Sequence, residues 1–408
     1  MPKHAVAVLG ATGFTGVLAA EYLAEHLDKS LSLAIAGRSA DKLEAMRRRL
    51  APVREGVDVV VADAADAAAI DALAASTAVL VSAVGPFWTH GPAIVEACIR
   101  HGTHYLDCTG ETHFIKKLIE ELHDKAVAAK TVIMPACAFE PFLPDLGAFL
   151  VARHLRTKGA ATGTVRYSLV KLNAAGISGG TIHSLSCTLA LGKAILGPVD
   201  SNPSCLEPPD TSLAKQPVRG PPTYFYDRDL ASWQSWFVPA AGNIRLARRS
   251  AALLGYGPSF SFVETLAHGN SVAAFFAGVG QVVVFSLLHL AFIRALLAWL
   301  IPVGSGPSAA KMKTGSLDAR LFGESADKQH RCVGSIRYGQ DPGYRGTAVL
   351  LGEAAICLAT QGSELRQAAA NRPLRTLEGG VLTGASALGN TIIERLERAG
   401  FELHIDDE

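Results

Sequence analysis

A glycine-rich turn between an apolar run and a helical pattern constrains the fold of this chain more than any other feature. The apolar run Val6–Leu9 passes directly into the turn, and Val17–Leu27 has the pattern of an amphipathic helix. A buried strand that ends in such a turn and opens a helix presents backbone N–H groups to a phosphate. The predicted phosphate turn consists of Gly10, Ala11, Thr12, Gly13, Phe14, Thr15 and Gly16.

Each glycine of the turn has a separate expected role. Gly10 permits the tight turn, Gly13 lets the backbone approach a diphosphate, and Gly16 lets the helix pack closely on the strand. The spacing is G-x-x-G-x-x-G rather than G-x-G-x-x-G. The prediction of a dinucleotide site therefore depends on the strand before the turn and the helix after it. An ordinary glycine turn is the alternative.

The end of a second expected strand, Leu31–Ala36, indicates which dinucleotide would bind. An NAD-preferring fold usually carries Asp or Glu there for the ribose 2′-hydroxyl. This chain has Arg38 and Ser39 instead, with Lys42 one helical turn later. Arg38 can bind a phosphate with two N–H groups and Ser39 can donate to it, which favours NADP(H). A solvated Arg38 at a strand end is the alternative.

Strand and helix patterns alternate through the first 150 residues, which predicts a doubly wound parallel sheet. Further strands are expected at Val57–Val61, Ala78–Val84, His104–Leu106 and Thr131–Met134, and further helices at Ala40–Leu50, Ala67–Ala75, Pro92–His101 and Thr112–Ala129. Ligands bind at the carboxyl ends of such strands. We therefore add Asp63, as an acceptor for an adenine amino group, and Val84, Gly85 and Pro86, along which the cofactor would extend toward its nicotinamide.

Composition narrows the function classes. At 408 residues the chain is long for one core, which predicts more than one domain. The 38 Lys and Arg residues balance 37 Asp and Glu residues, which argues against nucleic-acid binding. Seven scattered cysteines without a C-x-x-C pair argue against a disulfide framework or a zinc site. With no signal-peptide pattern before the first strand, a cytoplasmic location is expected.

The pattern changes beyond residue 160. Val165–Lys171 alternates like a half-exposed antiparallel strand, and Ser178–Thr181 starts a helix that is expected to run to about Leu196. Seven prolines between Gly197 and Pro222 predict a long surface excursion or lid. Short strands are expected near 224–225, 259–264 and 330–338, and the last helices at 344–360 and 388–399. The predicted domains are 1–155 (cofactor-binding), 156–340 (α+β) and 341–408 (C-terminal helices).

An apolar stretch over 273–301 is the main complication. No Asp, Glu, Lys or Arg occurs from Ala273 to Ile293, and about 20 apolar residues can span a bilayer. However, Gln281 and His289 interrupt the stretch, and a span would separate residues 303–408 from the cofactor domain. We expect a segment that dips into one leaflet or lines an apolar substrate entrance. A core or homodimer-interface helix and a spanning helix are the alternatives.

Eight segments in order along the chain resemble the saccharopine dehydrogenase-like oxidoreductases, a family that includes the trans-acting enoyl reductases of bacterial lipid assembly. They are VLGATGFTG (8–16), AGRS (36–39), VGPFWTHG (84–91), YLDCTGE (105–111), SGGT (178–181), GSGPS (304–308), DPGYRGTAVLLGEAAICLA (341–359) and GGVLTGASALG (379–389). The resemblance implies a Rossmann-type NADP(H) domain, an inserted α+β domain and C-terminal helices that pack back on the first domain. It further implies a role in lipid or glycolipid metabolism and attachment to a membrane or lipid droplet.

One segment departs from the family. Where relatives usually read G-F-D-S-I-P-S-D, residues 138–145 read A-F-E-P-F-L-P-D, so the serines are replaced. This segment follows the sixth expected strand, beside the expected nicotinamide face. The departure therefore bears on the substrate and on turnover.

Hydride transfer needs an aligned acceptor and one group that supplies or takes a proton. The candidates are Glu111, His90, Tyr105 and Asp145. Glu111 is a desolvated acid or a cap of the helix that follows it, and Asp145 is a candidate cap of the helix after it. Tyr105 has the position of a core aromatic residue, and His90 stands at the entrance of the helix expected from Pro92.

These observations lead to one main hypothesis and two alternatives. The main hypothesis is an NADPH-dependent reductase of a lipid-like or otherwise apolar substrate. The first alternative is a saccharopine-type amino-acid dehydrogenase, for which Arg245, Arg248 and Arg249 are the available binders of substrate carboxylates. The second is a catalytically weak protein that keeps its cofactor fold for attachment to membranes or lipid droplets.

Overall fold

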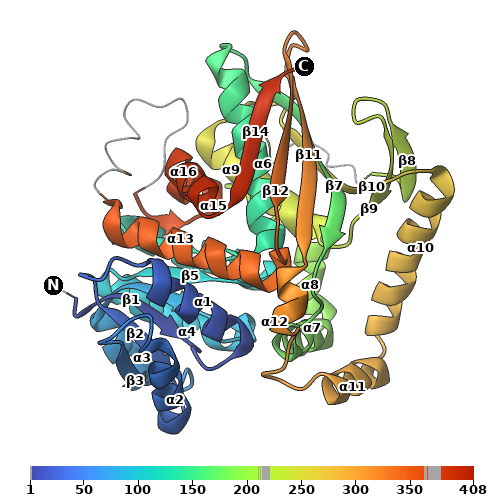
Figure 1. Ribbon diagram of the computed structural model, residues 1–408. Helices are drawn as coiled ribbons and strands as arrows, with labels where there is room; N and C mark the ends of the chain where they lie inside the picture. Colours follow the sequence, from blue (N-terminus) through green and yellow to red (C-terminus); the bar gives the residue numbers. More distant parts are fainter. Residues whose placement is uncertain (1, 210, 212, 214–220, 363–364, 366–377) are drawn as a thin grey trace.

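Two sheets organise the computed structural model, which describes residues 2–209, 211, 213, 221–362, 365 and 378–408 (Figure 1). The first sheet is parallel, with the strand order β13-β6-β5-β4-β1-β2-β3. Its strands are β1 (His4–Leu9), β2 (Leu33–Gly37), β3 (Asp58–Val61), β4 (Thr77–Ser82), β5 (His104–Asp107), β6 (Val132–Met134) and β13 (Gly380–Val381). The predicted α/β fold with a doubly wound parallel sheet is confirmed.

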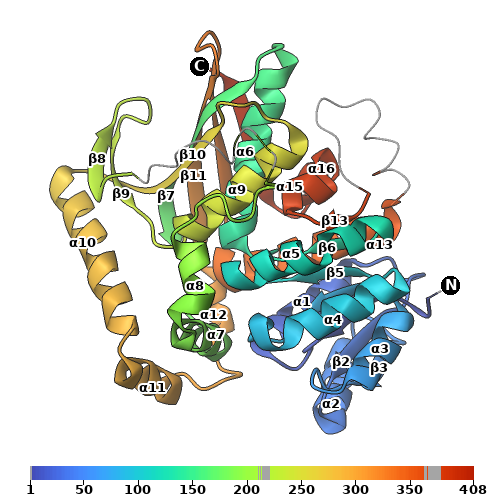
Figure 2. The ribbon, with the colours of Figure 1, turned by 180° about the vertical axis from the view of Figure 1, so that it is seen from behind.

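Helices cover both faces of this first sheet, which explains its continuous apolar strands. Val6 and Val8 pack with the helices on one face, whereas Ala7 and Leu9 pack with those on the other. The helices are α1 (Phe14–His26), α2 (Ala40–Leu50) and α13 (Thr347–Thr360) on the first face, and α3 (Ala67–Ala75), α4 (Phe87–His101) and α5 (Thr112–Ala128) on the second (Figure 2). α13, which contacts α1, returns the C-terminal part of the chain to this domain.

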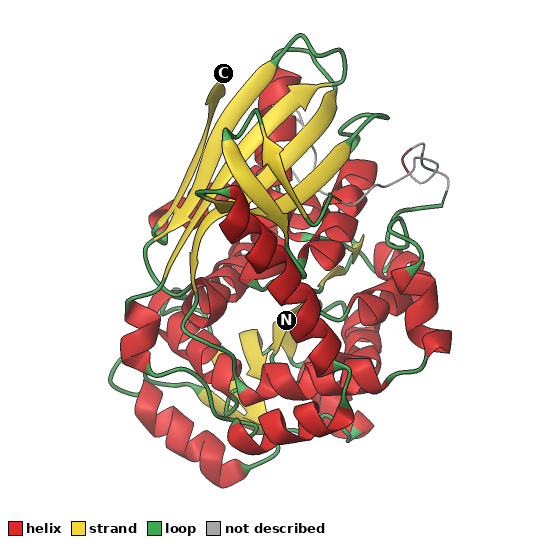
Figure 3. Ribbon diagram, turned by 90° about the vertical axis from the view of Figure 1, so that its right-hand side faces the viewer, coloured by secondary structure: helices red, strands yellow, loops and turns green. Residues whose placement is uncertain are grey.

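The second sheet is mixed, with the strand order β14-β12-β11-β7-β10-β9-β8 (Figure 3). Its strands are β7 (Thr162–Asn173), β8 (Tyr224–Asp227), β9 (Ser232–Trp236), β10 (Ser261–His268), β11 (Ser316–Ser325), β12 (Arg331–Tyr338) and β14 (Phe401–Asp407). β7 pairs antiparallel with β11, as its alternating pattern predicts, but parallel with β10. Because β13 joins the first sheet and β14 the second, the last part of the chain contributes to both.

Helix α6 (Phe139–Thr157) connects the two sheets. Four residues separate it from the end of β6, and it packs on β7 and β11, with most of its side chains buried. From the sequence, Pro141 and Pro144 argue against a helix that begins at Phe139, and a helix was expected only after Asp145. The first turn tolerates Pro141 because the N–H groups there lack helical partners in any case.

Several predicted boundaries were wrong. The helix expected from Pro92 begins five residues earlier, at Phe87. The helix expected to reach Leu196 is instead two helices, α7 (Gly179–Ala190) and α8 (Lys193–Asp200), at 99° to each other. The last expected helix, 388–399, corresponds to α16 (Asn390–Arg398), whereas the short helix α15 (Gly384–Leu388) before it was not expected; Gly389, with φ +54°, separates the two. The remaining elements are α9 (Ala240–Leu254), α12 (Ala309–Lys313) and the single π-helical turn η2 (Pro342–Gly346).

The proline-rich excursion over 197–222 lies partly outside the described residues, which omit 210, 212 and 214–220. Its described part is not a free lid. Leu206 is fully buried, and Glu207 forms a buried ion pair with Arg248 of α9. The segment therefore packs against α9.

The apolar stretch forms α10 (Ser271–Leu288) and the shorter α11 (Ala291–Leu300), which run along one side of the molecule (Figure 1). α10 is long and apolar enough to span a membrane, yet only 11% of it is buried in the protein. One edge of α10 is tied to the second sheet. Gln281 accepts from the Val238 N–H (3.0 Å) and donates to the Trp236 carbonyl (2.8 Å).

Candidate functional site

The glycine turn after β1 forms a cradle at the start of α1. Gly10 has φ +82°, and its N–H donates to the Ala36 carbonyl at 2.9 Å. A Cβ on Gly16 would lie 2.1 Å from the Gly10 carbonyl oxygen, so this position requires glycine. α1 starts at Phe14 with no side-chain cap and no acid in its first turn. Its first N–H groups are therefore available to an anion, which fits the diphosphate of a dinucleotide.

Two cationic side chains that have no partner among the described residues, Arg38 and Lys42, lie just after β2. Arg38 and Lys42 are exposed, and neither side chain forms a hydrogen bond or an ion pair within the described part of the chain. Ser39 caps α2 by accepting from the Lys42 N–H at 3.5 Å, which leaves its hydroxyl hydrogen free to donate. This arrangement fits a 2′-phosphate.

The other predicted cofactor residues lie at the same edge of the sheet. Asp63 is exposed after β3, and one of its oxygens already accepts from the Ala65 N–H at 3.0 Å. Val84, Gly85 and Pro86 follow β4. A Cβ on Gly85 would lie 2.7 Å from the hydroxyl of Ser184, so α7 crosses close to the end of β4.

Residues far along the chain cover the phosphate turn, and the sequence did not assign them to the cofactor site. The Phe14 ring packs edge-on against Tyr344 (centroids 4.9 Å apart), and a Cβ on Gly306 would meet that Phe14 ring at 2.5 Å. Tyr344 accepts a hydrogen bond from the Ser178 N–H, and Gly179 donates to Ser305 at 3.1 Å. Two of the resembling segments, SGGT and GSGPS, contain the glycines at these close approaches, Gly179 and Gly306, and DPGYRG contributes Tyr344.

Glu111 is a capping residue, but of a different helix from the one expected. Its carboxylate accepts from the N–H groups of Phe87 (3.0 Å) and Trp88 (2.7 Å), at the start of α4 rather than of α5. This cap explains why α4 begins before Pro92. Burial raises the pKa of Glu111, and these hydrogen bonds oppose the rise.

The other three catalytic candidates differ in position. Tyr105 is fully buried in the core and donates to Asp107 at 2.9 Å. Asp145 lies inside α6 rather than before it, and its carboxylate accepts from the Ala385 N–H (3.0 Å) at the start of α15; burial raises its pKa to about 6. The expectation that Asp145 caps the helix after it was therefore wrong. His90 is half-buried in the first turn of α4, and its ring makes no hydrogen bond within the described residues.

Asp107 begins the 107–111 loop after β5, which the sequence places among the ligand-binding strand ends, although Asp107 is not one of the catalytic candidates; it stabilises the edge of the sheet beside these loops. Its Oδ1 accepts from the N–H groups of Thr109 and Ala136, both at 2.9 Å, which ties the end of β5 to the end of β6. Burial raises the pKa of this carboxyl to about 7. Within the described residues, no group of three or more His, Cys, Asp or Glu side chains is placed to hold a metal ion.

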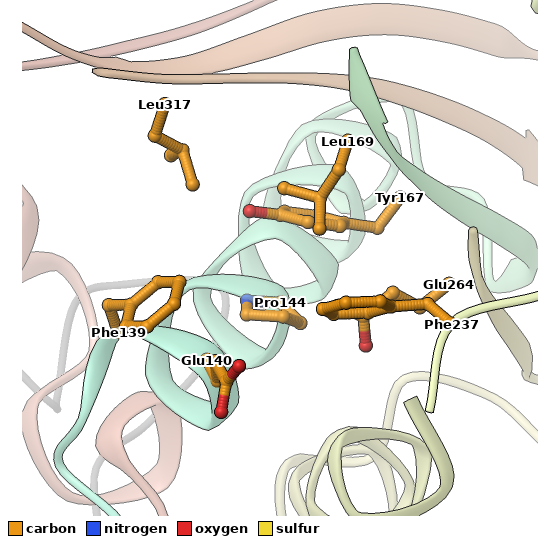
Figure 4. Close-up of a pocket in the computed structure, with 8 residues that line it drawn as sticks. All are labelled: Phe139, Glu140, Pro144, Tyr167, Leu169, Phe237, Glu264 and Leu317. Carbon is orange, nitrogen blue, oxygen red and sulfur yellow. The ribbon is translucent and has the colours of Figure 1, made fainter. Parts of the chain in front are cut away.

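A pocket opens where α6 meets the second sheet (Figure 4). Two acids line it: Glu140 from the first turn of α6 and Glu264 from β10. The remaining lining residues are aromatic, aliphatic or proline: Phe139, Pro144, Tyr167, Leu169, Phe237 and Leu317. Burial raises the pKa of Glu140 to about 7 and that of Glu264 to about 8. The pocket therefore has an apolar wall and two carboxyl groups that favour the neutral form.

The raised pKa of Glu264 predicts a pH-dependent stability. The unfolded chain loses this proton near the ordinary glutamate pKa of 4.5, whereas the folded chain keeps it to about 8. The free energy of unfolding contributed by this group is therefore fully present below 4.5 and falls as the pH rises toward 8. We expect Glu264→Gln to gain stability relative to the unsubstituted protein as the pH is raised from about 5 to about 8. Urea unfolding of both proteins across this range checks it, and a difference independent of pH would contradict it.

The three arginines considered for substrate carboxylates are engaged elsewhere. All lie on α9 and are buried. Arg245 donates to the Val199 carbonyl (2.7 Å), Arg248 pairs with Glu207 (2.5 Å) and Arg249 donates to the Val381 carbonyl (2.6 Å). They hold α8, the segment at Leu206 and Glu207, and strand β13 to α9, so they are not available to a substrate.

Comparison with known proteins agrees with this geometry. Residues 6–134 match the family model of the saccharopine dehydrogenase NADP-binding domain. A Mycobacterium tuberculosis protein assigned to the trans-acting enoyl reductases is 33% identical over 98% of this chain and 96% of its own length. The trans-acting enoyl reductase of Mycobacterium ulcerans is 32% identical over 97% and 96%. The apo structure of saccharopine dehydrogenase (L-Glu forming) from Saccharomyces cerevisiae shares the fold, with a TM-score of 0.52, 14% identity and 99% of both chains covered.

Proposed function

Because the chain belongs to the saccharopine dehydrogenase-like oxidoreductases and is an NADP-dependent member of them, we propose that it reduces a lipid-like acyl substrate with NADPH. The observation that carries the substrate class is the similarity to the trans-acting enoyl reductases. The small pocket at the start of α6 agrees with it, since its walls are apolar and its lining includes no Lys or Arg. The bound nicotinamide supplies the hydride, and the chain aligns the acceptor and provides a proton. The trans-acting enoyl reductases among its relatives favour a carbon–carbon double bond beside a carbonyl as the reduced group.

The residues of the pocket argue against the amino-acid dehydrogenase alternative. An amino-dicarboxylic acid needs cations for its carboxylates, and Arg, with two parallel N–H groups, is the residue best suited to this. Here Arg248 and Arg249 are committed to α9 contacts, and the pocket presents Glu140 and Glu264 instead. Neutral carboxyls in these positions offer a substrate carboxylate no opposite charge.

The proposed reaction is tested by following NADPH oxidation with a long-chain trans-2-enoyl thioester, and with saccharopine plus NADP as the competing substrate. Turnover of the thioester alone is the expected result. Turnover of saccharopine would favour the amino-acid dehydrogenase. NADPH binding without oxidation by either a thioester or a lipid extract would favour a protein that keeps only its cofactor fold.

The free cations at the end of β2 give a prediction on cofactor choice. We expect Arg38→Ala to weaken NADPH binding about ten- to a hundredfold, since a charge-assisted hydrogen bond contributes about 1.5–3 kcal/mol. NADH binding should change less than twofold, because NADH lacks the 2′-phosphate. Fluorescence titration with both nucleotides measures the two affinities, and equal losses for NADPH and NADH would contradict the assignment.

We further propose that α10 and α11 contact a membrane or lipid-droplet surface from one side. The supporting observation is an exposed apolar face: Phe276, Phe292 and Trp299 are 66%, 66% and 77% exposed, and large exposed apolar patches mark interaction sites. Because Gln281 anchors one edge of α10 to the second sheet, this pose needs no movement of α10 away from the protein. It would bring a lipid-like substrate to the same side of the molecule as the second sheet.

Replacing these three residues by glutamate should release the protein from lipid. We expect Phe276→Glu, Phe292→Glu and Trp299→Glu together to lower binding to vesicles of phosphatidylcholine and phosphatidylglycerol at least about tenfold, since each buried aromatic side chain contributes about 1.5–3 kcal/mol. Vesicle co-sedimentation measures this. The matched control carries glutamate at Val53, Val127 and Val333, which are also exposed but lie elsewhere on the molecule. Equal binding of the triple variant and the unsubstituted protein would rule out this surface.

A further inference from the structure

We propose that Glu140 is the acid that delivers the proton accompanying hydride transfer, with Glu264 as the second acid of the same pocket. This assignment rests on the proposed reductase function and deepens it. None of the four catalytic candidates from the sequence is placed as well as Glu140 to donate this proton. Glu111 and Asp145 accept from helix-start N–H groups, Tyr105 is enclosed in the core, and His90 does not line this pocket.

The position of Glu140 in the fold is the first argument. In a doubly wound sheet the dinucleotide lies across the carboxyl ends of the strands. The phosphate turn follows β1, and the predicted path of the cofactor continues past the end of β4 toward β5 and β6. Glu140 is the second residue of α6, which begins just beyond β6. It therefore stands at the same edge of the sheet, on the nicotinamide side of the phosphate turn.

The surroundings of Glu140 are the second argument. Its carboxyl is half-buried and has no hydrogen bond or ion pair within the described residues, whereas the other buried acids named above are tied to N–H groups. Glu264 is 1% exposed, and its Oε2 accepts from the Asn243 side chain at 2.8 Å. Figure 4 shows Glu140 on the α6 side and Glu264 across the pocket beside Phe237. A free carboxyl that faces an apolar pocket is placed to act on a bound molecule.

The charges around the pair keep it protonated near neutral pH. Among the lining residues, Tyr167 from β7 is the other titratable group, and none of the lining residues is Lys, Arg or His. Burial raises the pKa of Glu140, and the charge of Glu140 adds to the burial that raises the pKa of Glu264. Two neighbouring carboxyls in an apolar site do not both ionise readily. A general acid works best when its pKa lies near the working pH.

The chemical step balances with NADPH and the Glu140 carboxyl. One carbon of the substrate double bond gains the hydride that NADPH would supply, and the other gains the proton of the Glu140 carboxyl. The carbon–carbon π bond, the Glu140 O–H bond and the C–H bond of the hydride donor break, two C–H bonds form, and NADP+ is left. Glu140 remains as a carboxylate and, being half-buried, regains its proton from solvent.

Replacing either acid by its amide tests the assignment with little change in shape. We expect Glu140→Gln to lower kcat about a hundredfold while the KM and the NADPH affinity stay within about threefold. Its residual rate should no longer fall as the pH rises from about 6 to about 8. Glu264→Gln, which leaves the Glu140 carboxyl in place, should keep kcat within about threefold and keep that fall. Glu121→Gln, at an exposed position on α5, is the matched control and should behave as the unsubstituted enzyme. A kcat for Glu140→Gln within threefold of the control would overturn the proposal.

Infrared spectroscopy of the NADPH-bound protein gives a readout that does not depend on turnover. Protonated carboxyl bands should disappear as the pH rises from about 6 to about 9, one absent from Glu140→Gln and another from Glu264→Gln. If such bands are present but no enoyl thioester is reduced, the proposed substrate is wrong and the acid pair stands. If Glu140→Gln removes no titrating band, the acid assignment is overturned whether or not the enzyme turns over.

Discussion

Gly16→Ala is expected to weaken NADPH binding more than a hundredfold. The added Cβ would lie 2.1 Å from the Gly10 carbonyl oxygen and 2.7 Å from its carbonyl carbon, and both are backbone atoms that cannot rotate away. Gly10 cannot retreat either, because it packs against Ala83 and Val84 in the loop after β4. The start of α1 must therefore move away from β1, which displaces the N–H groups that bind the diphosphate.

Fluorescence titration with NADPH measures this loss, and circular dichroism confirms that the variant is folded. The matched control is Gly280→Ala, a glycine inside α10 whose Cβ position is open; it should bind NADPH normally and, if anything, gain helix stability. If Gly16→Ala binds NADPH with an affinity within tenfold of that of the unsubstituted protein, the structure of the turn is contradicted.

Arg249→Met is expected to destabilise the fold by about 3–5 kcal/mol. Arg249 is 1% exposed and joins three parts of the chain: α9, the Leu206 carbonyl (2.5 Å) and the Val381 carbonyl of β13 (2.6 Å). It also meets a ring nitrogen of His123 at 3.2 Å. Burial lowers its pKa to about 10, so the guanidinium stays charged at neutral pH. Methionine keeps much of the volume but leaves these carbonyls buried without donors.

Urea unfolding at neutral pH measures the loss. Arg48→Met is the control, since Arg48 is exposed on α2 and should change stability by less than about 0.5 kcal/mol. A loss below about 1 kcal/mol in Arg249→Met would mean that β13 and the Leu206 segment do not depend on this side chain.

The first domain was predictable because its signals are local. An apolar run, a glycine turn and a helical period follow each other within a few residues, and α2 and α3 have the predicted bounds. Helix α9 was missed because Arg245, Arg248 and Arg249 together suggest a solvated surface. Their burial depends on carbonyl oxygens and Glu207 from other segments, and no sequence pattern shows those partners.

The candidate site also has a part that the sequence predicts, the cofactor residues, and a part that it does not, the pocket. The cofactor positions come from short motifs at strand ends, so Gly10, Gly16 and Arg38 could be named from the sequence. The pocket draws Glu140, Tyr167 and Glu264 from three elements that are distant along the chain. Glu111 shows a related limit, since the sequence marks it as a cap but not which helix it caps. The pocket lining and the helix that Glu111 caps both depend on packing between distant segments. The periodicity of the sequence carries no information on that packing.

The central claim is that this chain is an NADPH-dependent reductase of an apolar acyl substrate. The most direct measurement is steady-state NADPH oxidation with trans-2-enoyl thioesters of increasing chain length, with the saturated product identified by mass spectrometry. We predict one saturated product for each NADPH consumed, with kcat/KM that rises with chain length as more of the chain contacts apolar side chains. Tight NADPH binding without oxidation by any enoyl thioester, or oxidation that is insensitive to chain length, would contradict the account.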